Sequence, residues 1–558
     1  MLVCLIFKDL LLERAVGMSE VCVELVGKLV GEMLGLSKEE LSPSDNLISL
    51  GLGSLDIMRI AGLLTKNGCN VTFSELVSNP CMASWVNFAR ERSARSSSNG
   101  SPLLGSANYS KGDPFPITSV QHAYMVGRRD GQELGGTACH AYMEFECGSL
   151  DAAKLERAVE LLILRHPMLR ARFSDDGTAR IEDKVTWKGL TTYRVEGAGN
   201  PDSRIEGIRQ ELSHLRFDIE QDDLIDVRLT VVSPKRTIMH INVDLLAADV
   251  LSIQVLLEDL AHLYDGTDLA PIEIDFMEYA RRTGIGEDAR NEDREYWLNR
   301  IDNMPGGPSL PLKAPMESVK RSQFTRMEYL IDSKSWKNFT EKGRQIGVTQ
   351  SMGIAAVYAK ALSRWSEDKK FLLNLPLFNR KPIHPDVDKI VSDFTSLILL
   401  EADCANAISL LELASQMQGR FQQDVAHSSF GAVEVLRELS HRCPNDPKKA
   451  PVVFASNIGT QFISNKVEDV FGPLSKMLAE TPQVLLDHQI YDHKNGLLLA
   501  WDYVSELLDD KIAKQMFEAY CTAVRFYCEN DWSEPFPDLL PPSQRAARAE
   551  ANSEGADL

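Results

Sequence analysis

Four short helical patterns occupy the first hundred residues of the chain. Apolar residues recur at helical spacing within Ser19–Leu36, and a second apolar run, Leu55–Leu64, has the same period. Two further short helical runs follow at Phe73–Val77 and Met82–Ala89, and the turn-forming segment Ser42–Asp45 separates the first two. The spacing predicts a small bundle of about four helices.

The apolar period is interrupted in the segment 93–113. Serine, glycine and asparagine dominate this stretch, and such a composition cannot bury enough apolar area to offset its ordering entropy. The segment is therefore expected to be a flexible linker.

Helical and strand periods alternate along the rest of the chain. The clearest helical runs are Ala152–Arg165, Val250–Leu263 and Gln350–Trp365, and the clearest strands are Thr237–Val243, Phe371–Leu375 and Leu497–Trp501. No internal repeat of about 20 to 50 residues is found. A mixed α/β architecture follows from this alternation.

Composition limits the possible classes of protein. A chain of 558 residues exceeds a single hydrophobic core, so two or more compact bodies are expected. The hydrophobic content of 44% and charged content of 25% are average for globular proteins. A net charge of -20 without a clustered basic face argues against a nucleic-acid partner.

Ten cysteines are scattered along the chain without a Cys-x-x-Cys pair, which favours reduced thiols and no metal site. No stretch approaches the roughly 20 apolar residues that span a bilayer, so we expect no membrane span and a cytoplasmic location. Residues 1–17 have no basic leader or small-residue cleavage site, and are expected to be an N-terminal extension.

A serine follows a glycine-punctuated loop at the start of the second predicted helix, in Leu50-Gly-Leu-Gly-Ser54. An isolated serine at such a position is usually a helix cap. Here the whole four-helix pattern resembles the acyl, peptidyl and aryl carrier domains. The resemblance implies that Ser54 carries 4′-phosphopantetheine, although many carriers have aspartate where this chain has Gly53.

Six ordered stretches beyond residue 114 resemble the heterocyclization family, a branch of the condensation domains of nonribosomal peptide synthetases. They are Phe115–Arg128, Arg165–Arg170, Asp244–Asp249 (where ordinary condensation domains carry His-His-x-x-x-Asp-Gly), Ser392–Leu400, Pro451–Ser456, and Thr481–Asp487 with Trp501–Asp502 behind it. Each stretch alone is weak, but their number and order are not a chance match. The whole arrangement is similar to the first subunits of pyochelin-type siderophore synthetases.

The resemblance implies a multidomain fold, with the small carrier bundle followed by a two-lobed α/β domain like chloramphenicol acetyltransferase. The expected divisions are an extension at 1–17, a carrier at 18–92, a linker at 93–113, an N-lobe at 114–285, a C-lobe at 286–535 and a connector to a downstream domain at 536–558. A tunnel between the lobes would hold the reaction, with a carrier docking at each mouth.

Loss of water from a five-membered ring needs proton transfer to a poor hydroxide leaving group, and a carboxyl group in a partly dry tunnel suits this task. The resemblance makes Asp487 the candidate general acid/base. The family often pairs this aspartate with a threonine, but here that position is Ala455. Either Ser456 or water replaces the hydroxyl, or the pair is not essential.

Other motif residues are expected to shape the tunnel. Asp244 and Asp249 occupy the family's double-aspartate motif, and Arg380 is the candidate ion-pair partner of Asp249. Thr395 is expected to line the tunnel and Gln483 to orient substrate, although both could be core hydrogen-bonding residues.

The resemblance implies that an aryl group, salicyl or a relative, is loaded on Ser54 by an aryl-acid adenylating enzyme acting in trans, after a phosphopantetheinyl transferase has modified the serine. The large domain would then condense the aryl group with a cysteine held on a downstream peptidyl carrier, beyond an adenylation domain, and cyclodehydrate it to a thiazoline. Two alternatives remain: condensation without cyclization, and a non-catalytic platform that only docks carriers. Serine or threonine could replace cysteine as the acceptor.

Overall fold

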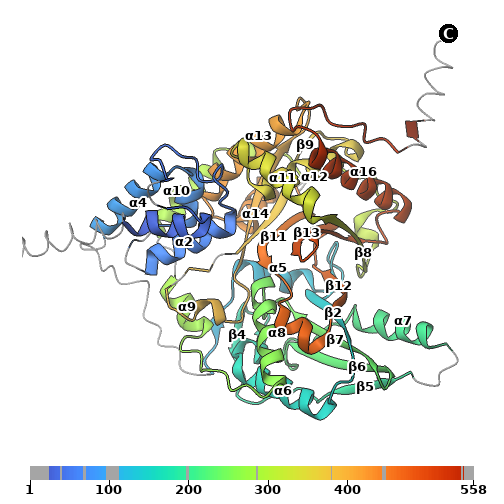
Figure 1. Cartoon of the computed structure of the whole chain (residues 1–558). Coiled ribbons are helices and arrows are strands. Elements are labelled where there is room, and N and C mark those ends of the chain that lie inside the picture. Colours follow the sequence, from blue (N-terminus) through green and yellow to red (C-terminus); the bar gives the residue numbers. More distant parts are fainter. Residues whose placement is uncertain are drawn as a thin grey trace, which may run out of the picture.

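A computed structural model describes residues 24–37, 40–66, 69, 71–95, 112–195, 200–283, 287–378, 380–381, 383–442, 448–541 and 544–545. A helical bundle (residues 24–95) lies beside a larger body of two lobes, as Figure 1 shows in blue for the bundle. The expected extension 1–17 and most of the linker 93–113 and connector 536–558 lie outside the described residues.

The bundle contains the predicted helices. Residues 24–34 are helical, and they are followed by α2 (Ser54–Lys66), α3 (Phe73–Ser78) and α4 (Met82–Arg95). The apolar stripe of α2 is buried at Ile57, Ile60 and Leu64, as the helical period predicts. The buried Trp85 indole donates a hydrogen bond of 2.9 Å to the carbonyl of Leu76 and ties α4 to α3.

The first lobe is built on a five-stranded sheet with the order β12-β2-β7-β6-β5 and a small sheet with the order β1-β4-β3. Its elements are β1 (Phe115–Pro116), α5 (Ser119–Gly127), β2 (His140–Cys147), α6 (Ala152–Arg165), β3 (Ala171–Ser174), β4 (Thr178–Ile181), β5 (Thr191–Arg194), α7 (Pro201–Leu212), β6 (Ile225–Ser233), β7 (Arg236–Asp244), α8 (Val250–Tyr264) and α9 (Phe276–Thr283). The central strand β7 is buried along all but its first residue, and its buried residues include the polar side chains of His240, Asn242 and Asp244.

The second lobe is built on a six-stranded sheet with the order β10-β9-β11-β13-β14-β8. Its elements are α10 (Glu287–Leu298), β8 (Phe324–Asp332), α11 (Ser333–Gln345), α12 (Gln350–Trp365), β9 (Lys370–Phe378), β10 (Thr395–Asp403), α13 (Leu410–Val425), α14 (Ala432–Arg442), β11 (Val452–Gln461), β13 (Leu486–His493), β14 (Gly496–Val504) and α16 (Asp510–Glu529). The core of this lobe lies between the sheet and the buried helix α12. The predicted helices at α6, α8 and α12 and the predicted strands at β7, β9 and β14 are all present.

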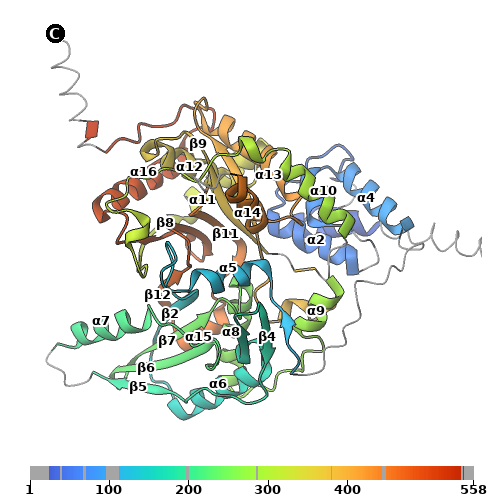
Figure 2. The same cartoon turned by 180° about the vertical axis from the view of Figure 1, so that it is seen from behind.

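One segment of the second half of the chain joins the first lobe. Helix α15 (Asn465–Phe471) packs near β2 and α8, and β12 (Leu474–Glu480) pairs antiparallel with β2. Figure 2 shows both elements among the strands of the lower lobe. A single division between residues 285 and 286 therefore does not separate the lobes, because this crossover ties them into one body.

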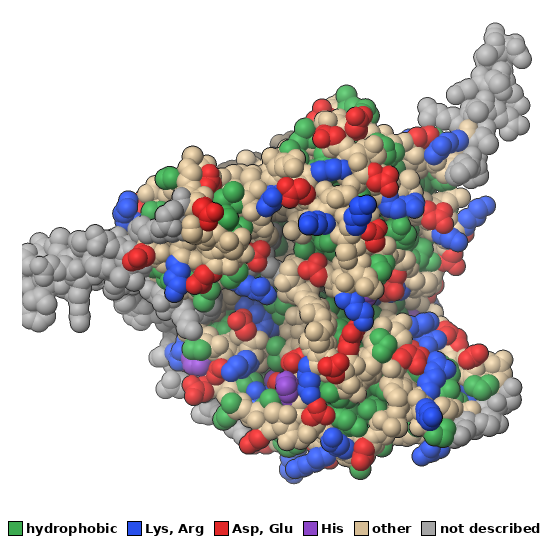
Figure 3. Space-filling view, viewed as in Figure 1, with side chains coloured by type: hydrophobic (Ala, Val, Ile, Leu, Met, Phe, Trp, Pro, Cys, Tyr) green, Lys and Arg blue, Asp and Glu red, His purple; other side chains and the backbone are tan. Residues whose placement is uncertain are grey.

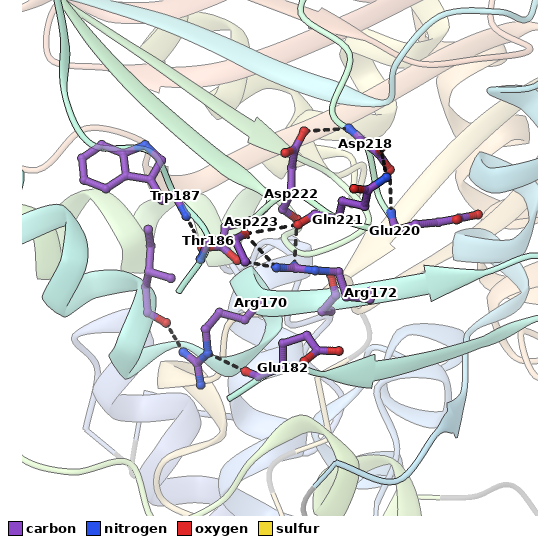
Figure 4. A network of polar contacts seen from close by, with 12 residues as sticks. Arg170, Arg172, Glu182, Thr186, Trp187, Asp218, Glu220, Gln221, Asp222 and Asp223 are labelled. Carbon is purple, nitrogen blue, oxygen red and sulfur yellow. Dashed lines mark hydrogen bonds and ion pairs between the residues drawn. The ribbon is translucent and has the colours of Figure 1, made fainter. Parts of the chain in front are cut away.

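The Arg165–Arg170 motif builds the first lobe rather than the space between lobes. The Arg170 guanidinium donates to the carbonyls of Ile163 and Glu182, which fixes the end of α6 against β4. Next to it, Arg172 forms a buried ion pair of 2.8 Å with Asp223, as Figure 4 shows. The arginines in this region are structural cross-links.

Acidic and basic side chains are interspersed on the face of the molecule that Figure 3 shows. None of the helices in the described ranges is both long and apolar enough to cross a bilayer. Six cysteines with described side chains are free thiols. The buried Cys69, however, is disulfide-bonded, so the expectation of reduced thiols is wrong at that position.

Candidate functional site

A cavity of about 540 Å³ lies between the two lobes. Helix α5 and the start of α8 contribute its wall from the first lobe, and strands β9, β10, β11 and β13 contribute the opposite wall. The polar residues of the wall that matter below are Tyr124, Asp249, Asp393, Thr395, Ser456, Gln483, Asp487, Gln489 and Tyr491. Five of the seven predicted site residues of the large domain therefore meet in one space, and Asp244 and Arg380 lie outside its lining.

Asp487 lies near the start of β13, and only 6% of it is exposed. Its Oδ2 accepts a hydrogen bond of 2.6 Å from the Gln489 amide, while its Oδ1 has no partner among the described residues. Burial, and then the negative charge of Asp502, raise the pKa of Asp487 to about 7. Near neutral pH, the protonated and the charged form of this carboxyl group are therefore both populated.

Three charged residues lie in a row across neighbouring strands beside the cavity. Asp487 on β13 is directly opposite Asp502 on β14, which is directly opposite Arg326 on β8. Arg326 donates to both oxygens of Asp502, at 2.7 and 2.5 Å, and this pair is buried. The guanidinium thus neutralises Asp502 in a bidentate pair, and Asp487 is left without a cation of its own.

Gln489 connects this row to Asp487. Its Oε1 accepts a hydrogen bond of 2.8 Å from Arg326 and another from the Tyr491 hydroxyl. Because two donors hold that oxygen, the amide N–H₂ is turned toward Asp487. Side chains two residues apart on a strand share one face, so Asp487, Gln489 and Tyr491 all face the cavity.

His488, next to Asp487 in the sequence, lies on the other face of β13. Its two ring nitrogens bond to the Ala500 carbonyl and the Tyr520 hydroxyl. Burial lowers its pKa to about 3, so the ring stays neutral. This histidine belongs to the core of the second lobe and takes no part in the cavity.

The double-aspartate motif divides into two different ion pairs. Asp244 pairs with Arg128 at 2.7 Å, with 4% or less of either side chain exposed, and joins the end of β7 to the end of α5. Asp249 caps α8 by accepting from the N–H of Ser252, and pairs with Arg380 at 2.9 Å. The predicted contact between Asp249 and Arg380 is present, and it links the two lobes.

Asp393 is a residue that the motif analysis did not single out. It lies in the cavity wall two residues before β10 and is 1% exposed. Its Oδ1 accepts a hydrogen bond of 3.0 Å from the N–H of Thr395. The only sequence signal was its place inside the Ser392–Leu400 stretch.

The position at which the family often has a threonine is occupied by Ala455. Ala455 lines the cavity, and the hydroxyl of Ser456 lies 2.7 Å from that of Ser351 on α12. No hydrogen bond joins Ser456 to Asp487, because the only partner of Asp487 among the described residues is Gln489.

Gln483 lies in the turn between β12 and β13, with a positive φ of 64°. Its N–H donates to the Leu134 carbonyl at 2.6 Å, and the turn packs tightly on α5. A Cβ at Gly127 would lie 2.7 Å from Pro482, so a glycine is needed for this close approach. The turn places the Gln483 side chain in the cavity wall.

The bundle lies close to the same cavity. Ser54 is the first residue of α2, behind the loop Gly51-Leu-Gly53. One turn later, Met58 faces a narrow pocket of about 50 Å³ that Ser351 and Ser456 also line. Ser456 therefore lies between the bundle and the main cavity, since it borders both spaces.

No group of three or more histidine, cysteine, aspartate or glutamate side chains in the described ranges is arranged to hold a metal ion. The start of α2 fits a phosphate ester, because the unpaired N–H groups of a first helical turn favour a negative group.

The chain matches two known families and several named proteins. Residues 115–530 match the condensation domain, and residues 24–89 match the phosphopantetheine attachment site. Phenyloxazoline synthase MbtB of Mycobacterium sp. (strain MCS) is 35% identical over 534 residues, which cover 94% of this chain and 45% of the relative. Pyochelin synthetase PchE of Pseudomonas aeruginosa (strain UCBPP-PA14) is 34% identical, over 96% of this chain and 37% of the relative. The chain thus spans less than half the length of these curated relatives.

Solved structures agree with the two-lobed fold. The cyclization-docking bidomain of the nonribosomal peptide synthetase EpoB from Sorangium cellulosum is 29% identical with a TM-score of 0.71, and the match covers 81% of this chain and 92% of that one. The X-domain from teicoplanin biosynthesis has a TM-score of 0.60 over 76% of this chain and 97% of that one, and at 17% identity it supports the fold alone.

Proposed function

This chain belongs to the condensation-domain family of the nonribosomal peptide synthetases, with a phosphopantetheine-attachment domain in front, and from this we propose that it condenses and then cyclizes. The carrier holds an aryl acyl group, salicyl or a close relative, at Ser54. The two-lobed domain joins this group to an amino acid with a nucleophilic side chain and closes a five-membered ring with loss of water. Phosphopantetheine would supply the thiol that carries the acyl group.

One observation carries the proposal: the Asp487 carboxyl group is buried in the interlobe cavity without a cationic partner, and its pKa is raised to about 7. A general acid works best when its pKa is near the working pH. Condensation alone creates no hydroxide leaving group, whereas ring closure does. The cavity therefore contains the proton donor that the second step needs.

The two steps make different demands on the chain. In the first, the acceptor amine forms a bond to the acyl carbon and the bond from that carbon to sulfur breaks. In the second, the acceptor's side chain attacks the new amide carbon and its proton passes to the carbonyl oxygen, which becomes the ring hydroxyl. Asp487 then gives a proton to this hydroxyl, which leaves as water, and the ring nitrogen returns a proton to the Asp487 carboxylate as the C=N bond forms. Gln489 holds the Asp487 carboxyl in place by a hydrogen bond.

The named relatives bear on the substrates. One is a phenyloxazoline synthase, and its name describes an aryl-substituted ring. This supports an aryl donor for the present chain. A cysteine acceptor would give a thiazoline, and serine or threonine would give an oxazoline; we retain cysteine as the proposed acceptor with the hydroxy amino acids as the alternative. Loading by a separate adenylating enzyme, a downstream adenylation and carrier pair, and a cytoplasmic location remain part of the proposal.

The test uses the chain with Ser54 converted to its salicyl-loaded form and an acceptor carrier bearing cysteine. The expected product on the acceptor is lighter by one water than the simple amide, as read by mass spectrometry. Asp487→Asn should leave loading of Ser54 unchanged and yield the amide without the ring. Asp388→Asn, the same change at an exposed aspartate between β9 and β10, is the matched control and should behave as the wild type.

The two alternatives give other products. Condensation without cyclization would leave the amide mass unchanged in the wild-type chain, and a docking platform would leave the acceptor unmodified. Ring formation by Asp487→Asn at the wild-type rate would remove Asp487 from the mechanism. Absence of modification at Ser54 by coenzyme A and a broad-specificity transferase would remove the carrier.

A further inference from the structure

The proposed ring closure leaves one buried carboxyl group of the cavity without a role. Asp393 is 1% exposed and lies in the wall of the same cavity as Asp487. The N–H of Thr395 holds its Oδ1, and its Oδ2 has no hydrogen-bond partner among the described residues. A buried carboxylate oxygen that has no partner within the protein is available to a proton of the substrate.

The surroundings of Asp393 raise the pKa of its carboxyl group toward neutral pH. Burial is the main cause that raises its pKa to about 7, and the charge of Asp249 adds to it. Arg380 acts in the opposite direction, but its Nη2 is bonded to Asp249 and not to Asp393. Tyr124 faces the cavity from α5 and stays neutral, because burial raises its pKa well above the usual value.

Asp393 and Asp487 occupy separate places in the cavity wall. The sheet order β10-β9-β11-β13 puts two strands between the one that follows Asp393 and the one that carries Asp487. Three strand spacings along a sheet amount to about 14 Å. Two carboxyl groups so placed cannot both act on one atom, so we expect them to serve different proton transfers.

Amide formation needs a proton acceptor of its own, because the amine nitrogen loses a proton as it bonds to the acyl carbon. Within the double-aspartate motif, Asp244 and Asp249 are held by arginines, and Leu245 lines the cavity with an aliphatic side chain. None of these can readily take the proton. Asp393 is the carboxyl group beside this motif that has a free oxygen and no arginine bonded to it.

We propose that Asp393 accepts the proton of the acceptor amine during amide formation, and that Asp487 serves only the later loss of water. This inference rests on the proposed function. The nitrogen–carbon bond forms, the carbon–sulfur bond breaks, and the proton passes from nitrogen to the Asp393 carboxylate and then to the departing sulfur. Asp393 ends the step as a carboxylate, so protons and electrons balance.

The decisive experiment separates the two steps in single-turnover reactions. Asp393→Asn should slow amide formation by about 10²-fold or more, the usual contribution of a general base. Ring closure, measured from an acceptor carrier that already bears the aryl amide of cysteine, should remain within about twofold of the wild type, because no amine proton is left to transfer. Asp487→Asn should show the reverse pattern. Asp388→Asn is again the matched control.

Unfolding and infrared measurements do not depend on the loaded enzyme, and a second variant tests the same carboxyl group. Asparagine keeps the Oδ1 that accepts from Thr395, so Asp393→Asn should unfold at no lower temperature than the wild type. The infrared band of protonated carboxyl groups should contain a component that titrates near pH 7, and Asp393→Asn should lose the part of it that Asp393 contributes while the part from Asp487 remains. Asp393→Glu, which retains a carboxyl group, should recover amide formation at least tenfold relative to Asp393→Asn.

Each outcome decides the matter. Amide formation at the wild-type rate in Asp393→Asn would overturn the inference, and so would equal slowing of both steps with no recovery in Asp393→Glu. An infrared component of equal amplitude in the wild type and in Asp393→Asn would overturn it as well. If the wild-type chain forms no amide at all, the proposed function fails first; if it forms amide and ring while Asp393→Asn does the same, only the inference fails.

Discussion

The Asp487 carboxyl group differs from its neighbour Asp502 in what it is paired with. Both are buried, but Asp502 accepts two hydrogen bonds from Arg326, while Asp487 accepts one from the neutral amide of Gln489. A buried carboxylate without a counter-charge is costly, and the protonated form is favoured instead. Because Arg326 pairs with Asp502 and not with Asp487, Asp487 can carry a proton at neutral pH.

The raised pKa of Asp487 predicts a pH-dependent stability. The folded state binds the proton more tightly than the unfolded state, so the contribution of this group is fully present below about pH 4 and is lost as pH rises through about 7. Asp487→Asn removes this loss of stability, because the asparagine side chain does not titrate. The variant should therefore gain stability over the wild type as pH rises, by up to about 4 kcal/mol at pH 8. Urea unfolding at pH 4 and pH 8 measures the difference, and an equal difference at both values would contradict it.

The Gln489 amide influences the pKa of Asp487. Its hydrogen bond lowers the pKa of Asp487 and partly offsets the effect of burial. Gln489→Met keeps the size of the side chain and removes this donor, so the pKa should rise and the acid should stay protonated to higher pH. The falling limb of the pH profile for ring closure should then move upward. Gln423→Met, at an exposed glutamine of α13, is the control and should leave the profile in place; a downward move of the limb in Gln489→Met would refute the assignment.

Motifs predicted some of these residues and could not predict others. Asp487 and Asp249 lie inside matched stretches of sequence, and Arg380 was predicted as the partner of Asp249 although it lies outside these stretches. Arg326 lies outside every motif, and its place opposite Asp502 depends on the register of β8 against β14. Such a register is set by packing between distant segments, which one sequence does not reveal.

At the scale of elements, period and composition predicted the helices and strands well where one face is buried. The helices α6 and α12 begin and end where the apolar period does. The crossover of α15 and β12 was not predicted, since nothing local to residues 465–480 shows that β12 pairs with β2 rather than with its sequence neighbours. The paired residues are about 330 positions apart in the sequence, and only the completed fold brings them together.

Gly472 lies between α15 and β12, the two elements of the crossover. Its φ is 77°, and a Cβ there would lie 2.1 Å from the Glu146 carbonyl oxygen on β2. Gly472→Ala should therefore force β12 away from β2 and lower the free energy of unfolding by about 2 kcal/mol or more. Ring closure should slow as well, because the N–H of Ala479 on β12 donates to Asp502 beside the site.

The control for this change is Gly419→Ala in helix α13. A Cβ at Gly419 would meet nothing within 4 Å, so alanine should be neutral or should stabilise the helix by up to about 1 kcal/mol. Thermal unfolding measures both variants. If Gly472→Ala unfolds at the temperature of Gly419→Ala, the close approach of the crossover to β2 is wrong.

At the scale of the whole molecule, the carrier bundle lies against the second lobe. The Arg344 guanidinium of α11 donates to the Leu50 carbonyl at 3.3 Å, just before the loop that leads to Ser54. Met58 and Phe73 of the bundle and Ser456 of the lobe line one narrow pocket. The serine that would bear the acyl group thus belongs to a loop and helix that contact the second lobe.

This contact predicts that a change on the lobe alone can slow delivery of the acyl group. Arg344→Glu removes the hydrogen bond to Leu50 and places a negative charge against its carbonyl oxygen. Transfer from Ser54 to an acceptor should slow several-fold, while the loading of Ser54 should not change, because Arg344 lies outside the carrier. An acyl group supplied on a short free thiol bypasses docking, so its rate should also stay at the wild-type value. Lys334→Glu, at the other end of the same helix, reverses the charge of an exposed residue away from the bundle and should have no effect. Equal transfer rates in Arg344→Glu and Lys334→Glu would show that the carrier delivers its cargo from another position, because the bond to Leu50 would then contribute nothing to the productive arrangement.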